Sequence, residues 1–267
     1  APHREAMTRR WAAGVEYFGT GYGGWQAQAE RASVQAELER ALGSVADHEV
    51  RTQCAGRTDA GVHAYGQVVH FESDAPRSVY AWVLGTNSRL PPDISLRWAQ
   101  EVRDDFSARH SAVARSYRYV VHNHHARSAL LAQRAAWITP RLDAEAMHRA
   151  AQALLGERDF SAFRAAECQS STPMRNVHAI HVWRSGDFVV MDIAANAFLH
   201  HMVRNIMGSL MEIGQGRKPE AWAAELLQGR DRGRAGMTAP AQGLYFVGPR
   251  YPEEFGLPLP AQPWFPA

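Results

Sequence analysis

The chain has 267 residues, of which 46% are hydrophobic and 21% are charged. This composition is typical of a globular protein and excludes a disordered tract or a coiled coil. No run of about 18 apolar residues is present and the opening segment APHREAMTRRW has no apolar stretch, so we expect neither a membrane span nor a secretory signal. The two cysteines, Cys54 and Cys168, are too far apart to indicate a disulfide framework. We therefore expect a protein of a reducing compartment, the cytoplasm.

The first part of the chain has the pattern of one α+β unit. Short segments rich in β-formers and bounded by turn residues predict strands; they are residues 11–18, 49–54, 66–72 and 94–99. Residues 34–46 place apolar side chains at helical spacing behind Ser33, a residue that favours the N-cap position, so we expect a helix there. A second helix is expected near residues 79–85.

The second part repeats this order of elements in outline. Strands are expected at residues 115–122, 176–184, 188–194 and 244–250, with a hairpin turn at 185–187. Helices are expected at 143–155 behind Asp143, at 198–213, and from Pro219 to Gly229. Strands outnumber crossover helices, so the fold class is α+β and not a doubly wound sheet. We divide the chain into an N-terminal half, 1–105, and a C-terminal half, 106–267.

The distribution of charge says more than the net charge of +2. Residues 106–142 contain six arginines and four histidines and no Asp or Glu. Such a stretch can bind phosphate groups, and arginine is well suited to that task. A GC-rich genome would also favour arginine, since Lys218 is the only lysine of the chain. The acid-free stretch is nevertheless a candidate RNA-binding surface.

The most informative segment runs from Cys54 to His63, CAGRTDAGVH, between two predicted strands. Its two glycines allow a tight loop, and Arg57 and Asp59 place a cation and a carboxylate two residues apart at the loop tip. Taken alone, these residues favour a tight turn with a solvated ion pair over a catalytic site.

The sequence GRTDAGVHA followed by GQVVHF resembles the signature loop of the tRNA pseudouridine synthases of the A family. The resemblance covers nearly the whole chain. It continues through GWQ (24–26), SVQ (33–35), NSRLPPDI (87–94), FSAR (106–109), SYRY (116–119), DFSAF (159–163), AFLHHMVRN (197–205) and GLY (243–245). Phe18 departs from the family, which usually has Asp there, and the basic N-terminal extension has no family counterpart.

The resemblance implies a pseudouridine synthase fold, in which two α+β halves share a central, mostly antiparallel sheet with helices packed on it and the active cleft lies between the halves. It also implies a tRNA-modifying isomerase that converts uridine to pseudouridine at positions 38, 39 and 40 of the anticodon stem-loop, without metal, nucleotide or redox cofactor. Similar proteins are homodimers, so we expect a homodimer with the tRNA crossing both subunits.

Four residues receive roles from the resemblance. Asp59 is the expected catalytic carboxylate, and Arg204 is its expected guanidinium partner, which would keep it ionised. Tyr117 matches the tyrosine that lies against the target base, where it would stack on uracil or help remove the C5 proton. Arg57 matches the residue that fills the space left by the flipped base.

Other functions remain open at this point. A non-catalytic tRNA-binding protein would share the basic stretch, and an N-glycosylase or nucleoside hydrolase would use a carboxylate on the same glycosidic bond. Two groups of histidines, His200 with His201 and the set at 122, 124 and 125, lack the spacing of metal ligands. The glycines of residues 19–24 lack the Lys-Ser/Thr ending of a phosphate-binding loop.

Overall fold

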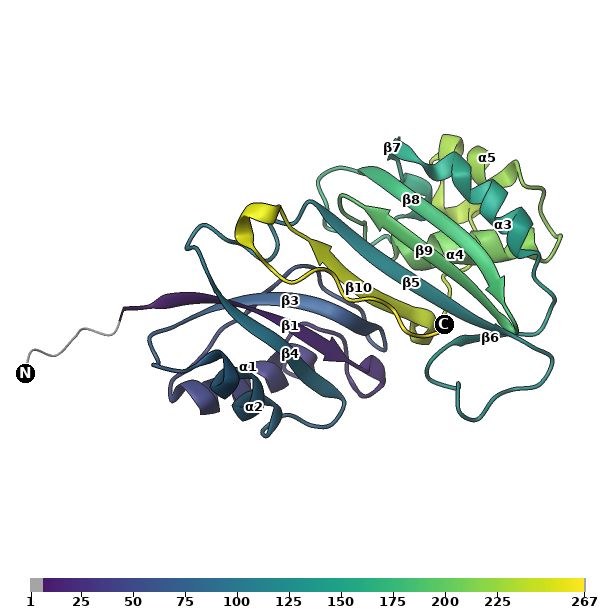
Figure 1. Cartoon of the computed structure of the whole chain (residues 1–267). Coiled ribbons are helices and arrows are strands. Elements are labelled where there is room, and N and C mark those ends of the chain that lie inside the picture. Colours follow the sequence, from purple (N-terminus) through teal and green to yellow (C-terminus); the bar gives the residue numbers. More distant parts are fainter. Residues whose placement is uncertain (1–6, 267) are drawn as a thin grey trace, which may run out of the picture. The chain divides into compact units, whose positions relative to one another are not determined.

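The computed structural model describes residues 7–266, and within that range the chain forms ten strands and five α-helices (Figure 1). The strands are β1 (Arg9–Tyr17), β2 (Gln53–Cys54), β3 (His63–Ser73), β4 (Ile94–Val102), β5 (Ala114–Asn123), β6 (Ala136–Ile138), β7 (Gly156–Asp159), β8 (Met174–Ser185), β9 (Phe188–Ala195) and β10 (Leu244–Arg250). The helices are α1 (Val34–Ala46), α2 (Val79–Asn87), α3 (Ala144–Ala151), α4 (Met202–Gly214) and α5 (Trp222–Gly229). The prediction of an α+β fold with a mostly antiparallel sheet is confirmed.

The chain forms two compact units. The first extends to Val113 and also includes Phe246–Gln262, and the second consists of Ala114–Tyr245 and the residues from Pro263 onward. The domain ranges 1–105 and 106–267 stay a prediction, and the N-terminal extension lies mostly outside the described residues. Among the helices of the described range, none is both long and apolar enough to cross a bilayer.

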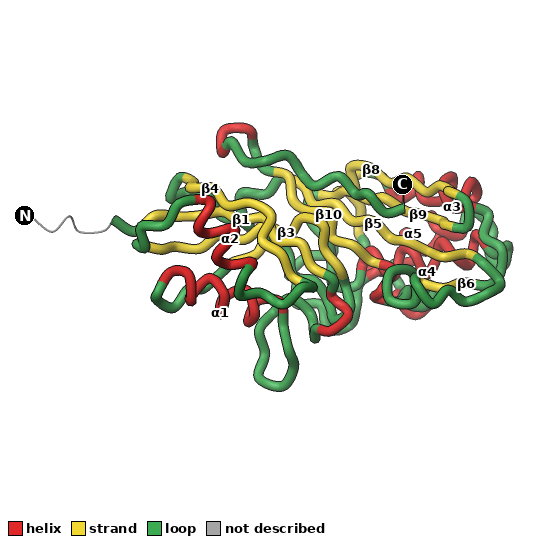
Figure 2. The backbone as a smooth tube through the Cα atoms, turned by 60° about the horizontal axis from the view of Figure 1, so that its bottom comes forward, coloured by secondary structure: helices red, strands yellow, loops and turns green. Residues whose placement is uncertain are grey.

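In the first unit, β1 pairs antiparallel with both β3 and β4, and β2 pairs with β3. The helices α1 and α2 lie together beside these strands, and α2 packs on β4 (Figure 2). The buried Trp82 of α2 contacts Trp11 of β1 and Phe71 of β3, with ring centroids 5.9 and 5.1 Å away. Helix α1 has the predicted bounds because the Ser33 hydroxyl accepts a hydrogen bond from the backbone N–H of Ala36 at 3.1 Å.

In the second unit, β9 lies between β5 and β8, and β7 pairs with β8; all three pairings are antiparallel. The exception is β6, a short strand that pairs parallel to β5 and was not predicted. Helix α3 contacts β8 and α4, and its predicted N-cap is confirmed by the hydrogen bond from the Ala146 N–H to Asp143 at 3.0 Å. The predicted hairpin turn is also confirmed, with Gly186 at a φ of +58°.

Four predicted elements differ from the structure. The helix expected at 143–155 is α-helical only to Ala151, and residues 152–154 form a 3₁₀ turn. The strand expected at 49–54 shortens to two residues, Gln53–Cys54. The helix expected at 198–213 begins only at Met202, because His201 has a left-handed backbone with a φ of +60° and cannot continue a right-handed helix. Helix α5 likewise begins at Trp222 and not at Pro219. Strand β7 was missed, since its four residues are too few for an alternating pattern.

Candidate active site

The loop that carries Arg57 and Asp59 lies between β2 and β3, as predicted. A hydrogen bond from the Val62 N–H to the Asp59 carbonyl, 3.1 Å long, closes a tight turn at its tip. Gly61 has a φ of +81°, which a residue with a side chain rarely adopts. The Arg57 side chain is exposed and the Asp59 side chain is half-buried. The loop therefore presents a carboxylate at the start of a closed turn and a cation two residues before it.

Phe18, which departs from the family pattern, packs against the end of this loop. Its ring stacks on the buried ring of His63, the first residue of β3, with centroids 4.6 Å apart and planes 3° from parallel. The backbone N–H of Gly19 also donates to Nδ1 of the same histidine at 2.9 Å. An apolar residue is therefore well accommodated at position 18.

The backbone before Asp59 is held by a neighbouring segment. The N–H of Trp25 donates to the carbonyl oxygen of Thr58 at 3.0 Å. Gly24 has a φ of +108°, and a Cβ there would lie 2.8 Å from that same carbonyl oxygen. The close approach of the two segments consequently requires glycine at position 24.

Buried polar side chains lie beneath the loop. The hydroxyl groups of Tyr17 and Thr58 are 2.7 Å apart. The Nε2 atom of Gln67 donates to the carbonyl oxygen of Gly56 at 2.6 Å. Tyr17 and Gln67 were not predicted from the sequence, where the one signal was a glutamine next to the two valines of GQVVHF.

Cys54, at the start of the loop, is unsuited to nucleophilic chemistry. Burial raises the pKa of its thiol to about 11, and the nearby charge of Arg57 lowers it only in part. The thiolate is the reactive form of cysteine, so Cys54 stays protonated near neutral pH. It is not in a disulfide, and neither is Cys168.

Tyr117 lies on β5 in the second unit. Its half-buried ring meets the ring of Phe198 edge to face, with centroids 5.0 Å apart. Because side chains alternate along a strand, Arg118 lies on the opposite face, where its guanidinium forms two hydrogen bonds of 2.8 and 2.9 Å with the carboxylate of Asp192. Tyr117 and Arg118 therefore serve different faces of the strand.

Arg204 lies in the first turn of α4, where it is only partly exposed. Its Nε donates to the carbonyl oxygen of Ala239 at 2.8 Å, and the Ala239 N–H donates to the Arg204 carbonyl at 3.1 Å. The segment before Ala239 comes so close to the helix that a Cβ at Gly208 would lie 1.7 Å from the Met237 carbonyl oxygen. Arg204 is thus fixed to its own unit by a reciprocal pair of hydrogen bonds.

The predicted site residues fall into two groups. Arg57 and Asp59 share one loop of the first unit, and Tyr117 and Arg204 belong to the second unit. The catalytic and binding roles of all four stay predictions.

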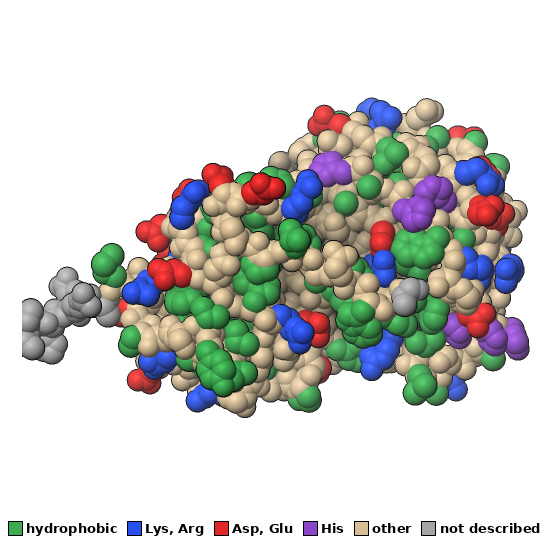
Figure 3. Space-filling view, viewed as in Figure 1, with side chains coloured by type: hydrophobic (Ala, Val, Ile, Leu, Met, Phe, Trp, Pro, Cys, Tyr) green, Lys and Arg blue, Asp and Glu red, His purple; other side chains and the backbone are tan. Residues whose placement is uncertain are grey.

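The acid-free stretch contains both structural and exposed arginines. Arg118 is buried and paired with Asp192, so it is engaged within the fold. Arg127, Arg134 and Arg141 are exposed. On the face seen in Figure 3, basic and acidic side chains are interspersed over most of the surface. Of the arginines in the acid-free stretch, the exposed ones are therefore the candidates for phosphate binding.

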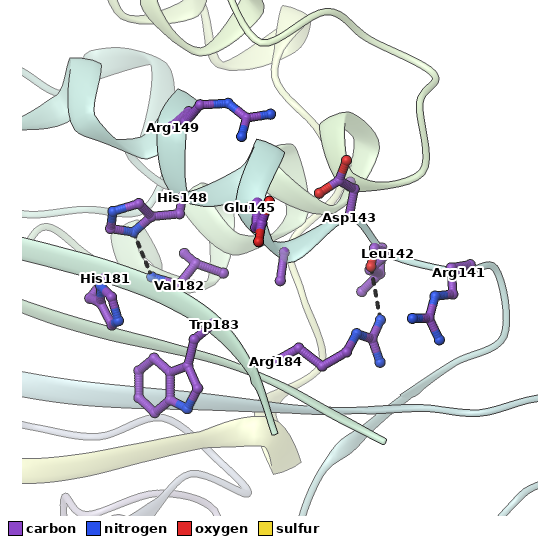
Figure 4. Close-up of a pocket in the computed structure, with 12 residues that line it drawn as sticks. Arg141, Leu142, Asp143, Glu145, His148, Arg149, His181, Val182, Trp183 and Arg184 are labelled. Carbon is purple, nitrogen blue, oxygen red and sulfur yellow. Dashed lines mark hydrogen bonds between the residues drawn. The ribbon is translucent and has the colours of Figure 1, made fainter. Parts of the chain in front are cut away.

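A pocket of about 830 Å³ in the second unit contains none of the four predicted residues (Figure 4). Its side chains hold α3 to β8. Nδ1 of His148 accepts a hydrogen bond from the Val182 N–H at 3.1 Å, and Arg184 donates to the Leu142 carbonyl at 2.8 Å. These polar groups therefore attach α3 and the segment before it to β8.

The chain matches the family model described as tRNA pseudouridine synthase over residues 13–111 and 150–252. It is 58% identical over 259 residues to a curated tRNA pseudouridine synthase A of Aeromonas hydrophila, with 96% of each chain covered. It is 59% identical over 249 residues to the tRNA pseudouridine synthase A of Shewanella amazonensis, covering 93% of this chain and 95% of the relative. The same enzyme of Shigella boydii is 57% identical, with 93% and 92% covered. The chain therefore belongs to the tRNA pseudouridine synthase family.

Proposed function

We propose that this protein isomerises uridine to pseudouridine at positions 38, 39 and 40 of the tRNA anticodon stem-loop, with Asp59 as the catalytic carboxylate. The observation that carries the proposal is the rigid loop that presents Asp59 beside Arg57, in a chain that belongs to this family. The matches to curated tRNA pseudouridine synthase A proteins cover nearly the whole length of this chain and of those relatives. A non-catalytic tRNA-binding protein would not need a carboxylate held in this way.

The reaction breaks the bond between N1 of uracil and C1′ of ribose and forms a new bond between C5 and C1′. N1 gains a proton, C5 loses one, and the product is an isomer of the substrate. In this proposal the Asp59 carboxylate stabilises positive charge at C1′ or adds covalently to the sugar or base. Either route needs an ionised carboxylate near neutral pH.

Arg204 and Tyr117 complete the proposed chemistry. The Arg204 guanidinium serves as the charge partner that orients the Asp59 carboxylate. Tyr117 stacks on the target uracil, and its hydroxyl assists removal of the C5 proton. The proposal requires these two residues of the second unit to act together with the loop of the first. Their anchoring, through Ala239 and Phe198, is consistent with fixed roles.

The target uridine must leave the helix before it can react, because a stacked base is inaccessible. Arg57, exposed next to Asp59, fills the space that the base leaves. Exposed arginines of the acid-free stretch bind the tRNA backbone. We place the enzyme in the cytoplasm with its substrate, working without a cofactor.

We further propose a homodimer with the tRNA crossing both subunits. The protein, whose chain has a mass of 29.7 kDa, would then have about twice that mass in solution at micromolar concentration. Light scattering coupled to size exclusion checks this directly, and a monomeric mass at every concentration would remove the dimer from the proposal.

The decisive test uses unmodified tRNA that carries tritium at uridine C5. The native protein is expected to release tritium without free uracil, and Asp59→Asn is expected to release none while binding tRNA within about threefold of the native affinity. Asp104→Asn, which neutralises an exposed carboxylate of the same unit, is the matched control and should remain active. Release of free uracil would indicate a glycosylase. Tight tRNA binding without release of tritium or uracil would indicate a non-catalytic tRNA-binding protein.

A further inference from the structure

Three polar side chains are buried beneath the loop of Arg57 and Asp59. Tyr17 is 3% exposed, Thr58 is 7% exposed and Gln67 is not exposed at all. Burying a hydroxyl or an amide costs free energy unless hydrogen bonds replace the lost water. The core elsewhere beneath the strands of this unit is largely apolar. A polar group of this size at this position therefore needs a specific explanation.

The three side chains form one connected chain of hydrogen bonds. Gln67 uses Nε2 to donate to the Gly56 carbonyl at 2.6 Å and, more weakly, to the Tyr17 hydroxyl at 3.5 Å. The Tyr17 hydroxyl in turn contacts the Thr58 hydroxyl at 2.7 Å. Burial raises the pKa of Tyr17 well above its ordinary value, so its hydroxyl keeps its proton. The network is thus satisfied and stays neutral.

Tyr17 lies where the sheet is irregular. The register between β1 and β3 shifts between Val15 and Tyr17, where Val15 pairs with Gln67 and Tyr17 pairs with Ala64. The extra residue is on β3, because three residue steps separate Gln67 from Ala64 and only two separate Val15 from Tyr17. Tyr17, the last residue of β1, lies next to the glutamine of β3, with its hydroxyl 3.5 Å from Gln67 Nε2.

The attachment points of this network lie on both sides of Arg57. Gly56 is held through its carbonyl by Gln67, and Thr58 is held through its hydroxyl by Tyr17 and through its carbonyl by the N–H of Trp25. The backbone that flanks Arg57 and leads directly into Asp59 therefore has little freedom. Misplacement of a reacting group by about 1 Å can reduce a rate about 100-fold.

We propose that Tyr17, Thr58 and Gln67 form a buried polar clamp that positions Asp59 and Arg57 for the reaction. The clamp residues are positioning residues, since none of them is exposed enough to contact the RNA. This inference rests on the proposed function, because it assigns the clamp a role only if Asp59 is catalytic. It predicts a loss of turnover that is larger than any loss of tRNA affinity.

The test compares Tyr17→Phe, Thr58→Val and Thr58→Ser in single-turnover tritium release, together with tRNA affinity and thermal unfolding. Tyr17→Phe and Thr58→Val each remove one hydroxyl with little change in volume, and each should slow release about 10- to 100-fold with affinity within about twofold. Thr58→Ser keeps the hydroxyl and should retain most of the native rate. The double variant Tyr17→Phe/Thr58→Val should be about as slow as either single variant, because both remove the same hydrogen bond.

The matched control is Tyr251→Phe, which removes a tyrosine hydroxyl that donates to the Ala108 carbonyl at 2.6 Å in the same unit. It should release tritium at the native rate. Equal slowing in the control, additive losses in the double variant, or native rates for Tyr17→Phe and Thr58→Val would each overturn the clamp. If instead Asp59→Asn is active, the proposed function itself fails, and the two failures are thereby distinguished. Thr58→Ser and Thr58→Val keep the comparison valid if Tyr17→Phe does not fold.

Discussion

Arg57 is the residue whose proposed role depends most on the structure of the RNA. It is exposed and follows Gly56, whose carbonyl is fixed by Gln67. A side chain that replaces a flipped base offsets the lost stacking of a paired uridine, which costs a few kcal/mol, and contributes less where the base is already unpaired.

We therefore expect Arg57→Ala to slow modification of a stem uridine at least about 10-fold more than modification of an unpaired loop uridine. The measurement is site-resolved pseudouridine formation in tRNAs that carry one target at a time. The control is Arg51→Ala, which removes an exposed arginine paired with Glu49 at 3.1 Å. Equal losses at stem and loop positions would contradict the role of Arg57 in base flipping.

Tyr117 offers a test of two functions in one side chain. Tyr117→Phe keeps the ring, and with it the edge-to-face contact to Phe198, but removes the hydroxyl. If the hydroxyl assists proton removal from C5, single-turnover tritium release should fall about 100-fold with unchanged tRNA affinity. Tyr117→Ala should lose both stacking and turnover. An unchanged rate in Tyr117→Phe would restrict the residue to stacking.

At the scale of elements, β3 is linked to the segment that follows β4 through a buried histidine. Nδ1 of His70 accepts a hydrogen bond from the Ala108 N–H at 2.9 Å, and the residue is 5% exposed. Burial, reinforced by the positive charge of Arg10, lowers the pKa of His70 to about 4. The ring is therefore neutral in the folded protein at neutral pH.

This pKa predicts a specific loss of stability in acid. Between the ordinary histidine pKa of about 6.5 and about 4, the unfolded chain binds a proton that the folded chain does not. His70 therefore contributes stability above pH 6.5, and up to about 1.4 kcal/mol per pH unit is lost as the pH falls through this window. Below about pH 4 both states are protonated and no further loss from His70 is expected.

The matched variant is His70→Asn, which offers an amide oxygen to the Ala108 N–H but does not titrate. We expect the free energy of unfolding, measured with urea at pH values from 7 to 4, to fall more steeply in the native protein than in the variant. The carboxylates titrate equally in both, so the difference isolates His70. Parallel curves would show that the pKa of His70 is close to its ordinary value.

At the scale of the whole molecule, the net charge of +2 is small for a protein that binds tRNA. The exposed arginines 127, 134 and 141 lie in a stretch without acidic residues. Each phosphate contact adds about 0.7 to 0.9 to the slope of log affinity against log salt. We therefore expect the triple change of these arginines to glutamine to weaken tRNA binding and to reduce this slope by about 2.

Titrations of tRNA binding between 50 and 200 mM salt provide the measurement. The control is the double change Arg51→Gln and Arg103→Gln, which removes exposed arginines that are paired with Glu49 and Asp105. It should leave the slope nearly unchanged, because neighbouring carboxylates already compensate these charges. An unchanged slope in the triple variant would show that the phosphate contacts lie in another part of the protein.

The sequence alone determined the elements that depend on local interactions. Helix α1 has its predicted bounds because Ser33 caps it and its apolar residues recur every three or four positions. The family and the loop of Arg57 and Asp59 were also determined by the sequence, since the motif is contiguous. Local capping, periodicity and turn glycines act over a few residues, so a sequence displays them directly.

Only the tertiary structure decided the features that depend on contacts between residues far apart in the sequence. The late start of α4 at Met202 follows from the left-handed backbone of His201, which the apolar pattern of residues 198–213 does not reveal. The contact between the hydroxyls of Tyr17 and Thr58 joins residues 41 positions apart, next to a shift in register between β1 and β3. Neither residue type nor spacing encodes such a contact, because it depends on how strands pair and where a bulge falls.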